Sequence, residues 1–232
     1  MIEVREVSTV VFGKDVNSSI EATLQKLFKS IDLNSDLASE VILIDDGSVE
    51  PLKESIPFQM QSQIQIIRNE KNQGIGDALL MGCQKAKYSS VLFLPGHDFY
   101  SIEAINLALQ LAGKAPVVIG YRTNMWERPP IKRFASLVFR NLLKMRTNRF
   151  ILDPHGLPIY PRQKVLDALP LGSRHALHIY VLRSICRENL GIIQFPAAIN
   201  PEYKETLLNG PGSYLTYGRN VMSVLKVIMK SN

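Results

Sequence analysis

The sequence predicts an α/β protein built on one mostly parallel sheet with helices on its faces. Short β-rich runs alternate with helical patterns through the first half of the chain, which is the pattern of βαβ units. Two of these runs, residues 41–44 and 91–94, are apolar at every position, as expected of strands that are covered on both faces. No repeat, low-complexity tract or linker is evident in the 232 residues. We therefore expect a single domain spanning residues 1–232.

The predicted elements follow one another at a regular spacing. Strands are expected at residues 7–12, 41–44, 64–68, 91–94, 116–121 and 191–195. Helices are expected at residues 17–30, 76–87, 101–112, 131–146, 176–188 and 214–230. Ser18 and Glu21 have the spacing of a capping box for the first helix, and Ser101 is placed to cap the third. Residues 153–162 are expected to form a loop, because Pro and Gly interrupt them.

Composition restricts the class of protein. A hydrophobic content of 46% with 21% charged residues is ordinary for a globular chain and argues against disorder. The longest apolar runs are too short to span a bilayer, and the first residues lack the pattern of a secretory signal. Cys83 and Cys186 lie in apolar helical stretches without metal-ligand spacing, so we expect buried free thiols. These features predict a cytoplasmic protein.

The positive charge of the chain is concentrated in one segment. Residues 121–150 hold eight basic side chains and a single acid, Glu127, so this segment carries +7 while the rest of the chain carries −1. On the helix expected at 131–146, Arg133, Arg140 and Lys144 lie close to one line beside an apolar stripe. A solvated helix face is one interpretation. An anionic partner, either a ligand or a membrane surface, is the other.

Acidic residues follow the second predicted strand directly. Asp45, Asp46, Gly47 and Ser48 place two carboxylates and a flexible glycine at a strand end, where ligands of parallel sheets bind. Such an acidic pair suits recognition of a nucleotide base and a ribose. Asp-Gly is also common in ordinary surface turns, so this tetrapeptide alone supports both interpretations.

Five segments, taken in order, resemble the family 2 glycosyltransferases, and most closely their polyprenyl-phosphate (dolichyl-phosphate mannose synthase-like) branch. These are residues 41–48, with the acidic pair; 69–82, NEKNQGIGDALLMG; 120–122, Gly-Tyr-Arg; 132–136, Lys-Arg-Phe-Ala-Ser; and 153–162, DPHGLPIYPR. The resemblance covers about residues 7–200. It implies a GT-A-like fold with a nucleotide-binding half over about 1–120 and an acceptor half over about 121–232.

The resemblance also implies roles for individual residues. Asp153 matches the general base that deprotonates the acceptor, which requires a carboxylate within hydrogen-bond reach of the attacking oxygen. An Asx turn before Pro154 is the structural alternative for this residue. The donor nucleotide is expected to contact Lys14, Asp45, Asp46, Gly74 and Asp98. The acceptor phosphate or the diphosphate is expected to contact Arg122, Lys132, Arg133 and Ser136.

The chain departs from the family where a metal is usually held. Pro95 and His97 stand in place of the two acids of the family's Asp-x-Asp motif, and Asp98 comes one position late. One interpretation retains a divalent metal, Mn²⁺ or Mg²⁺, on His97 and Asp98. A second has cations such as Lys14 or Arg122 neutralise the diphosphate without a metal. A third is that the site no longer catalyses a reaction.

The resemblance thus implies inverting transfer of a sugar from a UDP- or GDP-activated donor to a hydroxyl or phosphate acceptor, for example a polyprenyl phosphate or a growing glycan in cell-envelope or polysaccharide biosynthesis. A lipid acceptor would bring the chain to the inner face of a membrane, with the basic helix and Trp126 as contacts. Two alternatives stay open. One is a non-catalytic nucleotide-sugar-binding protein of the same fold, and the other is a basic nucleic-acid-binding module.

Overall fold

The computed structural model describes residues 5–123, 130–168 and 177–203. Within these ranges one sheet has the strand order β3-β2-β1-β4-β6-β5-β7. Its strands are β1 (Arg5–Gly13), β2 (Leu37–Asp45), β3 (Ile64–Arg68), β4 (Ser90–Pro95), β5 (Val117–Arg122), β6 (Leu157–Pro161) and β7 (Ile192–Ala197). The mostly parallel α/β sheet expected from the sequence is confirmed.

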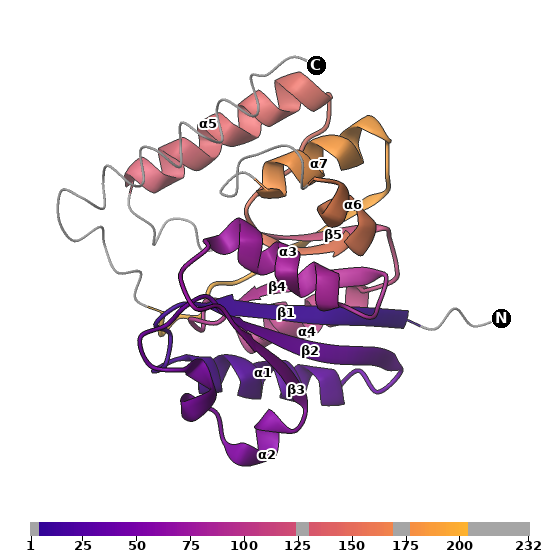
Figure 1. The fold of residues 1–232 in the computed structure, drawn as a ribbon. Helices are drawn as coiled ribbons and strands as arrows, with labels where there is room; N and C mark the ends of the chain where they lie inside the picture. Colours follow the sequence, from indigo (N-terminus) through magenta and orange to yellow (C-terminus); the bar gives the residue numbers. More distant parts are fainter. Residues whose placement is uncertain (1–4, 124–129, 169–176, 204–232) are drawn as a thin grey trace.

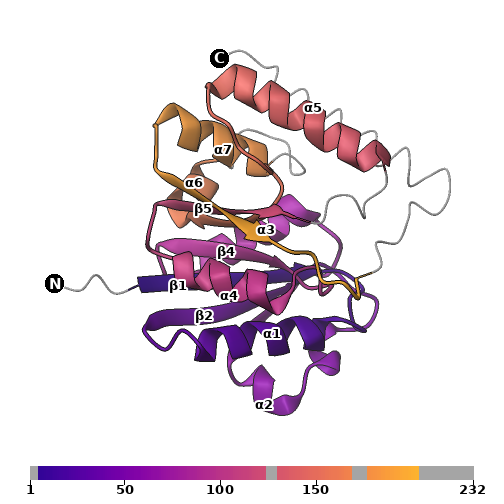
Figure 2. The same ribbon diagram turned by 180° about the vertical axis from the view of Figure 1, so that it is seen from behind.

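Helices cover both faces of this sheet (Figures 1 and 2). The helical segments are α1 (Ile20–Asp32), the short η1 (Leu52–Ser55) and α2 (Phe58–Gln61), α3 (Ile75–Lys85), α4 (Ile102–Leu111), α5 (Pro130–Thr147), α6 (Arg162–Asp167) and α7 (Leu177–Arg187). One core cluster joins α1 and α4 to one face, and a second joins α3, α6 and α7 to the other. Because both faces are buried, the central strands are apolar at consecutive positions.

The strand pairing places the candidate site residues at one edge of the sheet. β1 pairs in parallel with β2 and β4, and Gly13 lies opposite Asp45. β2 continues in parallel to β3, where Asp45 lies opposite Arg68. β4 and β5 both pair antiparallel with β6, so β5 runs in the same direction as β4. The carboxyl ends of β1 to β5 therefore share one edge, which is where ligands of such sheets bind.

The prediction of a loop at residues 153–162 is wrong over its second half. Residues Leu157–Pro161 form β6, which inserts between β4 and β5 and places Ile159 beside Leu92 on one side and Val118 on the other. The two prolines of this strand obscured its pattern in the sequence. Burial of Tyr160 and Leu157 against neighbours distant in the chain stabilises the strand in spite of these prolines.

The two predicted helix caps have different outcomes. Ser101 is the N-cap of α4, and its side chain accepts a hydrogen bond from the backbone N–H of Ala104. The predicted capping box at Ser18 is wrong, because α1 begins one residue later and Ser19 occupies the N-cap without a side-chain cap bond. The Ser19 hydroxyl instead donates to the Gly96 carbonyl of the loop after β4. Glu21 accepts a hydrogen bond from Gln25 on the same helix.

Both cysteines are buried free thiols, as expected. Burial raises the pKa of the Cys83 thiol to about 12, which keeps it protonated and unreactive at neutral pH. Trp126 and the helix expected at residues 214–230 lie outside the described residues. Among the helices that are described, none is both long enough and apolar enough to cross a membrane.

Candidate functional site

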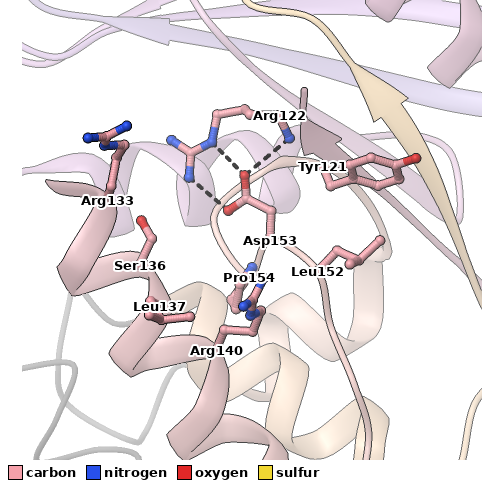
Figure 3. A pocket seen from close by; sticks show the side chains of 9 residues that line it. All are labelled: Tyr121, Arg122, Arg133, Ser136, Leu137, Arg140, Leu152, Asp153 and Pro154. Carbon is pink, nitrogen blue, oxygen red and sulfur yellow. Dashed lines mark hydrogen bonds and ion pairs between the residues drawn. The ribbon is translucent and has the colours of Figure 1, made fainter. Parts of the chain in front are cut away.

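A cavity of about 270 Å³ opens between the carboxyl end of β5, the loop before β6 and helix α5. Figure 3 shows its lining. The residues around it are Tyr121, Arg122, Arg133, Ser136, Leu137, Arg140, Leu152, Asp153 and Pro154. Three arginines and one carboxylate give the cavity a positive charge. We call it the arginine pocket.

A bidentate ion pair between Arg122 and Asp153 forms the wall of the arginine pocket. The Nε and Nη2 atoms of Arg122 donate to the two carboxylate oxygens of Asp153 at 2.5 and 2.7 Å. Both side chains are 7% exposed. Burial disfavours the charged carboxylate, but the charge and hydrogen bonds of Arg122 outweigh it and hold the pKa of Asp153 below its usual range. Asp153 is therefore an ionised carboxylate at neutral pH.

The backbone around Asp153 explains how the carboxylate is positioned. Its side chain accepts a hydrogen bond from the backbone N–H of His155, and its carbonyl accepts one from Gly156. This is the Asx-type turn that the sequence offered as the structural alternative. The turn and the ion pair exist together, because one carboxylate satisfies both sets of donors. Arg122 also donates its backbone N–H to the same carboxylate.

The other side of the arginine pocket is one face of α5. Arg133, Ser136, Leu137 and Arg140 follow one another at helical spacing, and Figure 3 shows them on the helix that borders the pocket beside the Arg122–Asp153 pair. The structure thus brings together four predicted residues: Arg122, Arg133, Ser136 and Asp153. The side chain of the fifth, Lys132, lies outside the described part of the chain.

Arg140 lines the arginine pocket but was not among the predicted site residues. Its guanidinium lies 5.4 Å from the ring centroid of Phe150, while its Nε is buried without a hydrogen-bond partner among the described residues. A buried donor of this kind is costly unless a ligand or water satisfies it. The signal was present in the sequence, because Arg140 follows Arg133 by seven residues, two helical turns.

The acidic pair at the end of β2 is buried, and its oxygens hold two loops. Asp45 accepts hydrogen bonds from the backbone N–H groups of Ser48 and Leu52. Asp46 accepts from the Asn69 side chain and from the backbone N–H groups of Gln73 and Gly74. These contacts shape the strand ends at which a nucleotide is expected. Direct contact of either carboxylate with a nucleotide stays a prediction.

Two further donor-site candidates lie at the same edge. Gly74 has a φ of 93°, a conformation that favours glycine, and it precedes the first turn of α3. Lys14 follows β1 directly, and its side chain is 41% exposed. Its Nζ lies 3.8 Å from the carboxylate of the neighbouring Asp15.

A second cavity, of about 660 Å³, runs along β3 and reaches Asp45 and Arg68. The two cavities have no lining residue in common.

The loop after β4 does not fit a divalent metal. Both oxygens of Asp98 accept from the Lys26 ammonium, at 2.8 and 2.9 Å, and one also accepts from the Asn200 amide at 2.7 Å. The ring of His97 packs 5.3 Å from that of Tyr203. Within the described residues, no three His, Cys, Asp or Glu side chains gather closely enough to hold a metal ion. A hard cation needs several oxygen ligands, and this loop does not supply them.

The sequence matches the family model described as "Glycosyl transferase family 2" over residues 14–164, about two thirds of the chain. The chain belongs to glycosyl transferase family 2. The matched residues include both Lys14, after β1, and Asp153, before β6. The division of the chain into halves near residue 120 stays a prediction.

One curated relative is "Dolichyl-phosphate beta-glucosyltransferase ALG5C" from Trichomonas vaginalis, which is 23% identical over 165 residues. The alignment covers 65% of this chain and 49% of the relative, so the chain spans about half the length of the curated relative that it matches.

Solved structures of glucosyl-3-phosphoglycerate synthase from Mycobacterium tuberculosis share the fold of this family member. A complex with Mn²⁺, UDP and glucosyl-3-phosphoglycerate has a TM-score of 0.68 at 17% identity, covering 97% of this chain and 80% of that one. A complex with phosphoglyceric acid has a TM-score of 0.69 at 18% identity, with the same coverage. The match to these glycosyltransferase structures confirms the GT-A-like fold expected from the sequence.

Proposed function

We propose that this chain transfers a sugar, with inversion, from a nucleotide-diphosphate donor to an acceptor that carries a phosphate group. Membership of glycosyl transferase family 2 supports the reaction type. The observation that carries the acceptor class is the arginine pocket, which faces the buried Arg122–Asp153 pair at the carboxyl edge of the sheet.

The charges of the arginine pocket match a phosphate monoester. Asp153 compensates Arg122, whereas Arg133 and Arg140 have no carboxylate partner among the described residues. Two uncompensated guanidinium groups suit a phosphate monoester, which carries about −1.5 to −2 charges at neutral pH. Ser136 adds a hydroxyl donor on the same helix face. The names of the relatives agree with this class, since they specify dolichyl phosphate and phosphoglycerate.

The donor is assigned to the carboxyl ends of β1, β2 and β3. Asp45 and Asp46 shape this edge, and Gly74 presents the start of α3 to it. A helix N-terminus with a preceding glycine favours a phosphate group, because its N–H groups point outward and the helix dipole is positive there. The M. tuberculosis structures in complex with UDP and with UDP-glucose support a uridine nucleotide as the first donor to test.

The role of Asp153 depends on which acceptor oxygen attacks the sugar. A hydroxyl must lose a proton, and Asp153 would accept it. A phosphate oxygen is already ionised at neutral pH and needs no base. The pairing of Asp153 with Arg122 lowers the pKa of the carboxyl and weakens it as a base, which favours the phosphate oxygen. In that case Asp153 acts by orienting Arg122. Either oxygen gives inversion when it displaces the nucleotide in a single in-line step.

Steady-state transfer from UDP- and GDP-sugars to short-chain polyprenyl phosphate and to phosphoglycerate tests the proposal. Arg133→Ala and Arg140→Ala are each expected to raise the KM for the acceptor roughly ten- to a hundredfold, because each removes a charge-assisted hydrogen bond. Lys144→Ala is the matched control, since this exposed residue on the same helix does not line the pocket. Equal effects of all three variants would contradict the assignment.

Asp153→Asn separates the two roles of Asp153. Loss of a general base would lower kcat by roughly 10²–10⁴-fold with a hydroxyl acceptor. With a phosphate acceptor we expect a smaller loss, seen mainly in KM. Nucleotide binding without turnover for any donor and acceptor would support the alternative of a non-catalytic family member, which the replaced Asp-x-Asp motif favours.

We further propose that α5 contacts an anionic membrane surface beside the arginine pocket. Phe134 and Met145 are 66% and 80% exposed, although they lie on the apolar side of a helix rich in Arg and Lys. Exposed apolar groups flanked by cations are typical of interfacial helices. Sedimentation with anionic and neutral lipid vesicles tests this. Phe134→Ser with Met145→Ser is expected to abolish binding to anionic vesicles, whereas Phe58→Ser, an exposed control on α2, is expected to retain it.

A further inference from the structure

Both carboxylate oxygens of Asp98 already accept hydrogen bonds from protein donors. Lys26 lies one and a half turns into α1 and donates to both oxygens. Asn200, which follows β7, donates its amide to one of these oxygens and to the Asp98 backbone carbonyl. The Asp98 side chain is only 17% exposed. Asp98 is thus a structural residue joining three segments that are distant in the chain.

The other groups of the loop after β4 also make contacts within the protein. The Gly96 carbonyl accepts the hydroxyls of Ser19 and Thr23, and the Gly96 N–H donates to Phe12. The ring of His97 lies among aromatic rings, with centroids 5.6 Å from Phe99 and 5.3 Å from Tyr203. Pro95 has no side-chain ligand to offer. Neither Mn²⁺ nor Mg²⁺ would find the oxygen ligands that it prefers.

A protein cation, Lys14, lies at the carboxyl edge of the sheet near the loop after β4. Lys14 is the first residue after β1, whose last residues pair with Pro95 of β4 and Asp45 of β2. It is therefore at the carboxyl edge between the loop after β4 and the acidic pair. Its side chain is 41% exposed, and its ammonium makes only a long contact, 3.8 Å, with the half-exposed Asp15. Such a weak surface pair costs little to break.

We propose that Lys14 neutralises the donor diphosphate and that this chain binds its nucleotide without a divalent cation. The inference rests on the proposed function. It goes beyond it because it assigns to Lys14 the positive charge that a metal ion, held by the acidic motif, usually supplies in the family. A lysine is suited to this role as a compact point charge on a flexible stem.

Calorimetry of UDP and GDP binding, in EDTA and in Mn²⁺, tests the inference without an activity assay. We expect the Kd to change less than about twofold between the two conditions, because no metal mediates the contact. Lys14→Ala is expected to weaken binding at least about tenfold, the effect of removing one charge-assisted contact. Lys87→Ala is the control, since this exposed lysine precedes β4 at the opposite edge of the sheet.

Three other results would each overturn a specific claim. Binding that tightens tenfold or more in Mn²⁺ would overturn metal independence while leaving the proposed function intact. Equal losses in Lys14→Ala and Lys87→Ala would overturn the assignment of Lys14. Absence of UDP and GDP binding under every condition would overturn the proposed function, and this inference with it.

Discussion

Gly156 lies directly against the backbone carbonyl oxygen of Gly120, so that a Cβ atom at position 156 would overlap that oxygen. The contact joins the turn after Asp153 to β5, two residues before Arg122. Gly156→Ala is expected to force the turn away from β5 and to cost more than about 3 kcal/mol, the cost of a severe steric conflict in a packed region. Urea unfolding monitored by circular dichroism measures it.

Gly74→Ala provides the contrast for this substitution. Position 74 has a φ of 93° but nothing within 4 Å of an added Cβ, so only backbone strain opposes the alanine. We expect a cost of about 1–2 kcal/mol there. A smaller effect of Gly156→Ala than of Gly74→Ala would contradict the close packing of the turn on β5.

The Arg122–Asp153 pair predicts a large coupling in a double-mutant cycle. Arg122→Met or Asp153→Leu alone leaves one buried group uncompensated, with an expected cost of about 3–5 kcal/mol for loss of a charge partner. The double variant Arg122→Met/Asp153→Leu is expected to be more stable than the sum of the single effects predicts. Lys164→Met, which breaks the exposed pair with Glu188, is the control and is expected to leave the free energy of unfolding nearly unchanged.

Acid sensitivity follows from the lowered pKa of Asp153. Because the folded-state pKa lies below the ordinary aspartate value of 3.8, the unfolded chain binds the proton more readily, and acid favours unfolding. The stabilisation is complete above about pH 5 and is lost as the pH falls through the folded-state pKa. Urea midpoints measured from neutral pH down into this acid range are expected to fall less steeply in Asp153→Asn than in the parent chain. Parallel curves would contradict the assignment.

The hydrogen bonds of Asp46 predict that loss of its carboxylate loosens the loop before α3 rather than the whole fold. Asp46→Ala removes the acceptor for Asn69, Gln73 and Gly74, so amide exchange at positions 73 and 74 is expected to accelerate. Nucleotide affinity is expected to fall because the loop before α3 loses its position. Asp36→Ala, which breaks an exposed pair with Arg5, is expected to leave both quantities unchanged. Unaltered protection at Gly74 in Asp46→Ala would show that other contacts hold the loop.

Much of the fold follows from local sequence patterns. β3 has the predicted bounds, residues 64–68, and Ser101 caps α4 as its position suggests. β6 was missed because its pairing partners lie about 40 and 70 residues away, while its prolines favour a loop locally. The cap of α1 was misplaced because Ser19 satisfies a carbonyl of another loop, which no neighbouring residue indicates.

The site residues could be predicted where their spacing in the sequence or the family resemblance indicates where they lie in the fold. Arg122, Arg133, Ser136 and Asp153 meet in one cavity, and the seven-residue spacing of Arg140 to Arg133 already suggested a fifth member. The pairing of Arg122 with Asp153 was not predicted, because Arg122 was expected to bind a phosphate and Asp153 to accept the proton of the acceptor. The ion pair between Asp98 and Lys26 could not be predicted either, because the two residues lie 72 positions apart in the sequence.

Reversal of chain direction at β6 has an architectural consequence. In a wholly parallel sheet, a segment reaches the ligand-binding edge only at the end of a strand, and the next strand needs a crossover helix. Here the amino end of β6 meets that edge, so the four residues from Asp153 to Gly156 arrive there directly from the end of α5 and the short segment behind it. One continuous stretch of chain therefore carries both α5 and the Asp153 carboxylate, and a shift of α5 would be transmitted to Asp153 through fewer than ten residues.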